Sequence, residues 1–161
     1  MYETILETLQ NLPISTAIAE AAWYFPWLEA VHVIAAALVV GVIAWLDLRL
    51  IWAASRERAV SVLSAEVLPF VWGAFAVAFI TGGLLFLSAA TRYGTNFPFL
   101  LKMGLLVLAG ANMAAFHALT AKRAHEWDEG RPPAWEARLA GGLSLIFWVG
   151  VVYCGRWIGF S

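Results

Sequence analysis

Four long hydrophobic runs dominate the chain, at residues 28–53, 69–91, 97–121 and 136–160. Each has about the 20 apolar residues that a helix needs to cross the hydrocarbon core of a bilayer. Backbone polar groups in lipid must be satisfied within their own segment, so we expect helices rather than isolated strands. Proline suits the first turn of a helix, and we expect the second span to begin at Pro69. The pattern predicts an all-α, integral membrane four-helix bundle.

Residues 1–27 follow a different pattern. Apolar side chains recur at helical spacing among polar ones through residues 5–12, and the pattern repeats after Pro13. This is typical of short amphipathic helices that lie on a membrane surface. The aromatic residues within 23–27 indicate an interfacial belt at the entry to the first span. We therefore divide the chain into an interfacial segment, 1–27, and a four-span bundle, 28–161.

The composition agrees with a membrane protein. Hydrophobic residues make up 62% of the 161 residues and charged residues 13%, and the mean hydropathy is +0.78. Soluble domains are nearer 45–50% apolar and roughly 25% charged. These values exclude a soluble single-core domain, a disordered protein and a nucleic-acid binder with a basic face. The expected surroundings are the lipid bilayer, and the single cysteine, Cys154, excludes an internal disulfide.

The basic residues predict an orientation. The first and third connections between spans carry Arg56, Arg58, Lys122, Arg123, Arg131 and Arg138. The second connection carries only Arg92. Because basic connections stay on the cytoplasmic side, both termini are expected to face outward, into the periplasm if the membrane is the inner membrane of a bacterium.

Depth in the membrane groups the ionisable residues into an outer and an inner layer. With a rise of roughly 1.5 Å per residue, His32 lies about 6 Å below the outer end of the first span, and Lys102 lies about 7–8 Å deep in the third. Glu29 is one turn above His32, and Arg156, near the outward end of the fourth span, belongs to the same layer. We select these four residues as candidates for binding a cofactor.

Two interpretations of the outer layer remain open. In the first, His32 is an axial ligand of haem iron, a common role of histidine, and Lys102 is the second ligand or binds a propionate. In the second, His32 hydrogen-bonds to Glu29 or to a backbone carbonyl, and Lys102 extends to the interface. Ionisable groups within spans are costly, which favours a functional hypothesis.

The inner layer contains Asp47, Arg49 and His117, with Asn112 one to two turns deeper in the membrane. His117 lies about 30 Å from the outer end of its span, so a single iron cannot bind both His117 and His32. For Asp47 and Arg49 we favour a structural ion pair over a proton entry point or a cofactor contact. His117 could be a ligand, a proton relay or a hydrogen-bonded polar residue.

Three spans and the C-terminus carry a resemblance to known families. The quoted stretches are WLEAVHVIAAALVVGVIAWLDLRL, LPFVWGAFAVAFITGGLLF, NFPFLLKMGLLVLAGANMAAFH and the closing GRWIGF. Over most of its length the chain resembles a family of small bacterial four-span inner-membrane proteins. It resembles more distantly the HemJ-type protoporphyrinogen oxidases and, more weakly, the CopD-type membrane domains.

The HemJ-type resemblance implies haem b, with the functionally important first-span histidine and third-span lysine falling on His32 and Lys102. The closing GRWIGF departs from that pattern, so oxidase activity is not implied. We therefore expect a haem-binding protein for electron transfer or redox sensing, beside a membrane redox partner. The alternatives are a HemJ-like porphyrinogen oxidase, and a non-redox copper or small-solute carrier or structural membrane subunit.

Overall fold

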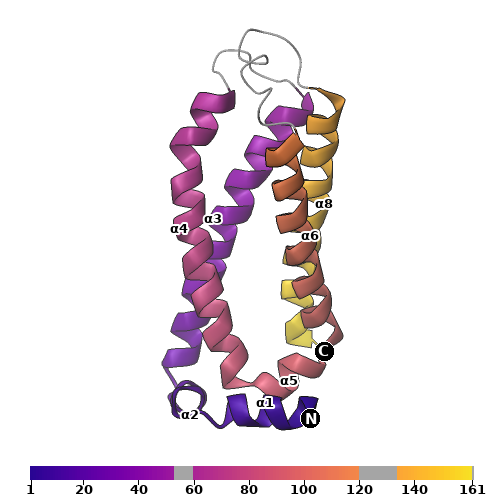
Figure 1. Ribbon diagram of the computed structural model, residues 1–161. Helices are drawn as coiled ribbons and strands as arrows, with labels where there is room; N and C mark the ends of the chain where they lie inside the picture. The colour runs from indigo at the N-terminus through magenta and orange to yellow at the C-terminus, as the bar shows by residue number, and fades with distance from the viewer. Residues whose placement is uncertain (53–59, 120–133, 161) are drawn as a thin grey trace.

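The computed structural model describes residues 1–52, 60–119 and 134–160, and these residues are helical without any strand (Figure 1). The helices are α1 (Tyr2–Gln10), α2 (Pro13–Glu20), α3 (Tyr24–Trp52), α4 (Val60–Ser88), α5 (Ala90–Thr95), α6 (Phe97–Leu119) and α8 (Trp135–Trp157), followed by the 3₁₀ turn η2 (Ile158–Phe160). The segments that are long and apolar enough to cross a membrane are Tyr24–Ile51, Glu66–Ser88, Phe97–Leu119 and Trp135–Phe160. The prediction of an all-α bundle with four candidate spans is therefore confirmed.

The expected boundaries of the second span are wrong at both ends. Helix α4 already begins at Val60, so Pro69 lies inside the helix instead of opening it. An interior proline removes one backbone hydrogen bond, a loss that membrane helices tolerate when neighbouring groups satisfy the freed carbonyl. At the other end α4 stops at Ser88, because Ala89 leaves the helical conformation with a φ of −150°. The short helix α5 then leads to α6.

The long helices form two pairs, α3 with α4 and α6 with α8, which are joined along α3 and α8 (Figure 1). In an 18-residue apolar stretch of each span, 17% of the residues are buried in α3 and 22% in α8, compared with 6% in α4 and 6% in α6. Helices α3 and α8 are therefore central. Among the described residues, α4 and α6 have no extensive contact with each other.

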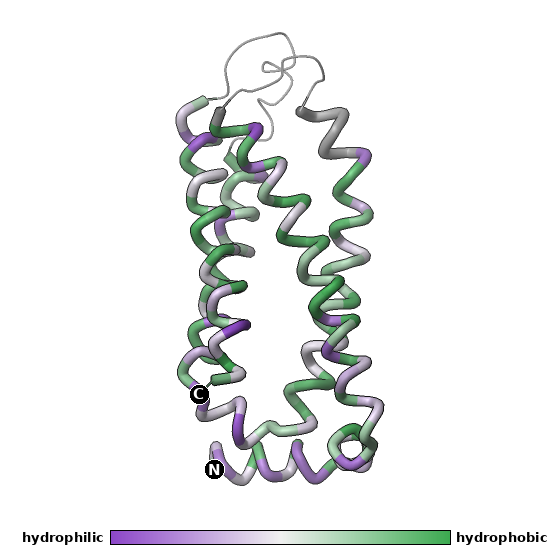
Figure 2. The backbone as a smooth tube through the Cα atoms, turned by 180° about the vertical axis from the view of Figure 1, so that it is seen from behind, coloured by the Kyte–Doolittle hydropathy of each residue, from purple (hydrophilic) through white to green (hydrophobic). Residues whose placement is uncertain are grey.

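Large apolar side chains cover the outside of the bundle. Phe70 and Phe79 on α4, Val107 on α6 and Trp135 on α8 are each at least 70% exposed. The long helices are mostly hydrophobic along their length, and hydrophilic residues gather near the two ends (Figure 2). Exposed apolar surface on this scale needs a non-aqueous neighbour, which supports contact with the lipid bilayer.

Both chain ends, α1, α2 and α5 lie at one end of the bundle, here called the terminal end; the opposite end is called the far end (Figure 1). Helix α1 lies across the terminal end of the bundle and is hydrogen-bonded to α5. The Tyr2 hydroxyl donates to Gly94 O at 2.9 Å, and Gln10 Oε1 accepts from the Thr91 hydroxyl at 2.6 Å and from the Thr91 amide at 3.1 Å. Leu6 is buried at the same contact. The N-terminal segment is thus part of the fold.

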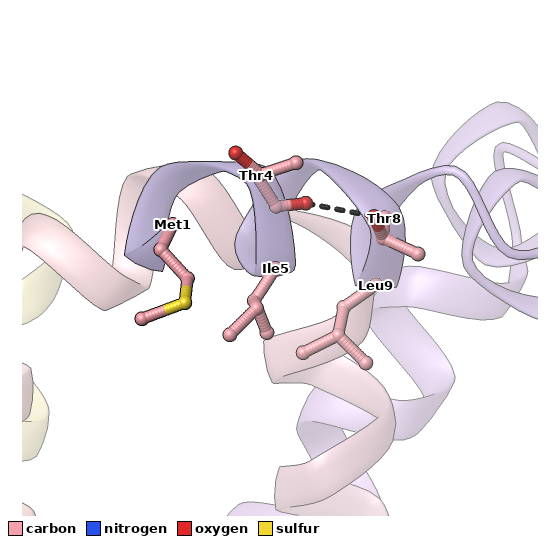
Figure 3. Close-up of a pocket in the computed structure, with 5 residues that line it drawn as sticks. All are labelled: Met1, Thr4, Ile5, Thr8 and Leu9. Carbon is pink, nitrogen blue, oxygen red and sulfur yellow. Dashed lines mark hydrogen bonds between the residues drawn. The ribbon is translucent and has the colours of Figure 1, made fainter.

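A shallow pocket follows α1 and is lined by Met1, Thr4, Ile5, Thr8 and Leu9 (Figure 3). Met1, Ile5 and Leu9 point to the same side of the helix, and Met1 and Ile5 are exposed. The Thr8 hydroxyl donates a hydrogen bond to Thr4 O at 2.7 Å. An uncovered apolar stripe suits the predicted place of α1 on a membrane surface. The residues that line the pocket include no histidine, cysteine or acidic side chain.

Candidate functional site

His32 is fixed between the first two spans. Its Nδ1 lies 2.9 Å from Ala78 O on α4 and 3.2 Å from the Thr81 hydroxyl. A backbone carbonyl only accepts hydrogen bonds, so Nδ1 must carry a proton. The Thr81 hydroxyl donates to Val77 O at 2.7 Å, which leaves its oxygen free to accept from the ring. The backbone of α4 therefore selects the protonation site of the imidazole, and this hydrogen bond to a backbone carbonyl is the one that the second interpretation of the outer layer expects.

This arrangement leaves the other ring nitrogen available. With Nδ1 protonated, the neutral imidazole has a lone pair on Nε2. Among the described residues, the Nε2 of His32 makes no hydrogen bond, since both bonds of the ring are made by Nδ1. Histidines that bind metals commonly donate the other N–H to a carbonyl, which fixes the ring and makes the ligating nitrogen more basic. His32 has this geometry before any ligand is considered.

Gly82 gives the His32 ring its place against α4. A Cβ at position 82 would stand 2.8 Å from Cε1 and 3.2 Å from Nδ1 of His32. The ring therefore lies on a patch of α4 that has no side chain. At the neighbouring Gly83 an added Cβ would meet nothing within 4 Å, so the close approach is particular to position 82.

Lys102 enters the same layer from α6. It is half-buried, and its Nζ lies 3.7 Å from where a Cβ on Gly155 of α8 would stand. Lys102 interacts electrostatically with the His32 ring and with Cys154, which is buried on α8. All four long helices thus contribute to one layer. The charge of Lys102 is near enough to act on His32, which is compatible with the single outer layer that the depth calculation predicts.

An aromatic group closes this layer toward the terminal end. Phe86 of α4 and Phe99 of α6 stack with ring centroids 5.3 Å apart, and Tyr93 of α5 lies 5.7 Å from Phe99. Phe86 is about one turn of α4 from Gly82, and Phe99 is about one turn of α6 from Lys102. The aromatic group therefore separates the His32 layer from the surface at α5.

The charge of Glu29 acts on both His32 and Tyr93. Glu29 itself is exposed. Burial raises the pKa of Tyr93 above its usual value, the positive charge of Arg92 opposes this shift, and the negative charge of Glu29 adds to it. The Tyr93 phenol therefore stays neutral well above physiological pH.

Arg156 lies on the surface near the chain end. It is exposed, and its guanidinium stands 4.8 Å from the centre of the Phe160 ring. Tyr153 and Trp157, one turn apart on the same helix, stack at 5.4 Å. This aromatic and cationic group resembles an interfacial belt. The contact that the structure gives Arg156 is with Phe160, and not with His32 or Lys102.

The residues of the expected inner layer divide among different contacts at the far end. Asp47 bonds to Ser144 of α8, and Asn112 Nδ2 donates to Ala140 O, also on α8, at 2.9 Å. Arg49 takes part in a further interaction of its own.

His117 is exposed and bonds to Met113 O on its own helix at 2.9 Å. It lies twenty residues beyond the start of α6, about 30 Å along the axis. His32 is near the terminal end, so the two histidines do not share a site. His125 lies outside the described residues.

The donor set limits what the bundle can hold. Within residues 1–52, 60–119 and 134–160, no three His, Cys, Asp or Glu side chains are grouped closely enough to hold a metal ion. Haem iron needs only one or two protein ligands in addition to its macrocycle. The Nε2 of His32 and the Lys102 amine in the same layer are nitrogen donors of the kind that such a group takes.

No protein-family model, curated protein or solved structure matches this chain. The site must therefore be judged on its own geometry. The sequence does not identify Ala78 and Thr81 as residues that position His32. It shows adjacent glycines, Gly82 and Gly83, in the middle of the second span, where helices can approach closely, but not which of them faces the first span.

Proposed function

We propose that this chain is a small multi-pass protein of the bacterial inner membrane that binds one b-type haem near the terminal end. His32 would be an axial ligand, and Lys102 the second ligand or the partner of a propionate. The observation that carries the proposal is the hydrogen bond from His32 Nδ1 to Ala78 O, which leaves Nε2 free. With both termini in the periplasm, as the basic connections favour, this layer lies near the periplasmic face.

The chain's own residues would orient and tune the group. Ala78 O holds the ring of His32 and increases the basicity of Nε2. Gly82 provides the surface that the ring lies on. Phe86 and Phe99 shield the layer from water at α5. A bound haem supplies one-electron chemistry, so the function we propose is electron transfer or redox sensing beside a larger membrane oxidoreductase.

Absorption spectra of the oxidised and dithionite-reduced protein test the proposal. We expect a Soret band and an α band that sharpens on reduction. His32→Ala should lose both bands. His117→Ala is the matched control, because His117 is exposed and, among the described residues, its hydrogen bond is to Met113 O on its own helix, and it should keep both bands. A colourless protein after expression with ample haem, or equal losses in both variants, would overturn the proposal and favour a carrier or structural subunit.

Replacing Lys102 separates its two possible roles. If Lys102 is the second ligand, Lys102→Leu should keep haem but change the spectrum to that of a singly ligated iron. If Lys102 binds a propionate, the spectrum of bound haem should be unchanged while the affinity for haem falls. In both cases the effect should be absent from a variant at Met103, which lies next to Lys102 and is exposed.

A second candidate is oxidation of a porphyrinogen at the same layer. It is favoured by the lack of extensive contact between α4 and α6 among the described residues, since a planar substrate dissolved in the bilayer would enter sideways. Porphyrin fluorescence that develops from a porphyrinogen with the wild type, and not with His32→Ala, would support it. No difference from the spontaneous rate would exclude it.

A further inference from the structure

Asp47 on α3 is a buried carboxyl group within a candidate membrane span. Its side chain is 7% exposed, and the span runs from Tyr24 to Ile51. The carboxyl bonds to Ser144 on α8. Its Oδ2 is buried and has no hydrogen-bond partner among the residues that the structure describes. None of the roles proposed above uses this group.

The described residues around Asp47 provide no group of three His, Cys, Asp or Glu side chains that could hold a metal ion. Helix α8 packs closely against the α3 backbone here, through Gly141. A Cβ on Gly141 would stand 3.2 Å from Asp47 O and 3.6 Å from Asp47 Cα. Because Oδ2 is itself enclosed, the cation that can reach it without separating the helices is a proton.

Among the residues that the structure describes, the other charged and titratable groups near the far end are exposed or have other contacts. On α8, the Arg138 Nε donates to Ile51 O at 3.1 Å, and Glu136 is exposed. On α6, His117 bonds to Met113 O. Glu66, at the start of the second span, is exposed. Arg49, two residues further along α3 than Asp47, lies on a different side of the helix and takes part in an interaction. The nearest bonded neighbour of the Asp47 carboxyl is therefore a neutral hydroxyl.

An ionised carboxylate in such a place is strongly disfavoured. Buried charges in proteins are paired, coordinate a metal or are neutralised by a proton. The hydrocarbon surroundings of a span increase this cost. An ionised carboxylate can accept several hydrogen bonds, and one hydroxyl supplies only one of them. Protonation removes the charge and leaves a single O–H group that still needs an acceptor.

We propose that Asp47 is a proton-binding site within the membrane, occupied at neutral pH while α3 and α8 are packed together. The proton resides on Oδ2, and the Ser144 hydroxyl donates to the other oxygen. The proton leaves or returns when the α3–α8 contact at Gly141 loosens, so proton exchange at the far end is coupled to helix packing. This proposal does not depend on haem.

Infrared spectroscopy of the full chain in lipid nanodiscs at pH 7 tests the proposal. The wild type should show the C=O stretching band of a protonated carboxylic acid, with a shift to lower frequency in D2O. Asp47→Asn should lose the band. Glu136→Gln is the matched control, because Glu136 is an exposed carboxyl near the same end, and it should keep the band.

Ser144→Ala provides a test that does not require removal of the carboxyl. Loss of the hydrogen bond to the C=O should move the acid band to higher frequency while its intensity remains. No acid band in the wild type at pH 7, or a band unchanged in both Asp47→Asn and Ser144→Ala, would overturn the proposal.

Discussion

Replacing Gly82 by alanine tests the packing that orients His32. The new Cβ would stand 2.8 Å from Cε1 and 3.2 Å from Nδ1 of the ring. Real Cβ atoms almost never approach other atoms so closely, so either the ring or the α3–α4 spacing must change. The ring is held by Ala78 O at 2.9 Å, and moving it weakens that hydrogen bond.

The expected loss of stability follows from three contributions. Overpacking costs about 1–3 kcal/mol, and a weakened hydrogen bond costs about 0.5–1.5 kcal/mol. The higher helix propensity of alanine than of glycine offsets about 1 kcal/mol of this loss. The free energy of unfolding should therefore fall by about 0.5–3.5 kcal/mol. Gly83→Ala, where the Cβ meets nothing within 4 Å, should be neutral or slightly stabilising.

Two measurements distinguish the variants. Unfolding in mixed micelles, followed by tryptophan fluorescence, gives the free-energy difference. The Nδ1–H resonance of His32 in histidine-labelled protein reports the hydrogen bond to Ala78 O directly and should shift in Gly82→Ala only. If Gly82→Ala and Gly83→Ala have equal stability and the same resonance, our account of the His32 position is refuted.

Two further predictions concern the terminal end. Gly94→Ala would place a Cβ 2.6 Å from Leu6 Cδ1, so we expect α1 to loosen from α5 and its amides to exchange faster with deuterium. Unchanged exchange relative to Gly104→Ala, which meets no atom within 4 Å, would contradict this. Because the charge of Glu29 helps to raise the pKa of Tyr93, Glu29→Gln should lower that pKa in an ultraviolet titration of phenolate. An equal or higher pKa would show that Glu29 does not act on Tyr93.

The sequence predicts how deep a residue lies in the membrane much better than it predicts which neighbouring helix the residue faces. The apolar runs place four spans, and a constant rise per residue puts His32 and Lys102 in one layer. Neither indicates that His32 faces α4, because the span is apolar on all sides. The hydrogen bond to Ala78 therefore appears only in the folded bundle.

Other details depend on the neighbours of each residue in the folded protein. Pro69 marks a possible helix start, but the residues before it also form a helix, so the boundary moves to Val60. Asp47 and Arg49 are two residues apart, which places them on different sides of α3. The structure gives Asp47 a bond to Ser144, a partner on α8 that spacing along one helix could not identify.

The two helix pairs are each continuous in the sequence, α3 with α4 and α6 with α8. Membrane helices insert first and associate afterwards, so each pair can form a hairpin once its second helix is in the bilayer. The contacts of His32 with Ala78 and Gly82 lie within the first hairpin, and the contact of Lys102 with Gly155 lies within the second. During biosynthesis the two halves of the site are therefore built separately, and a ligand between them can be retained only after the last span has been inserted and α8 has docked on α3.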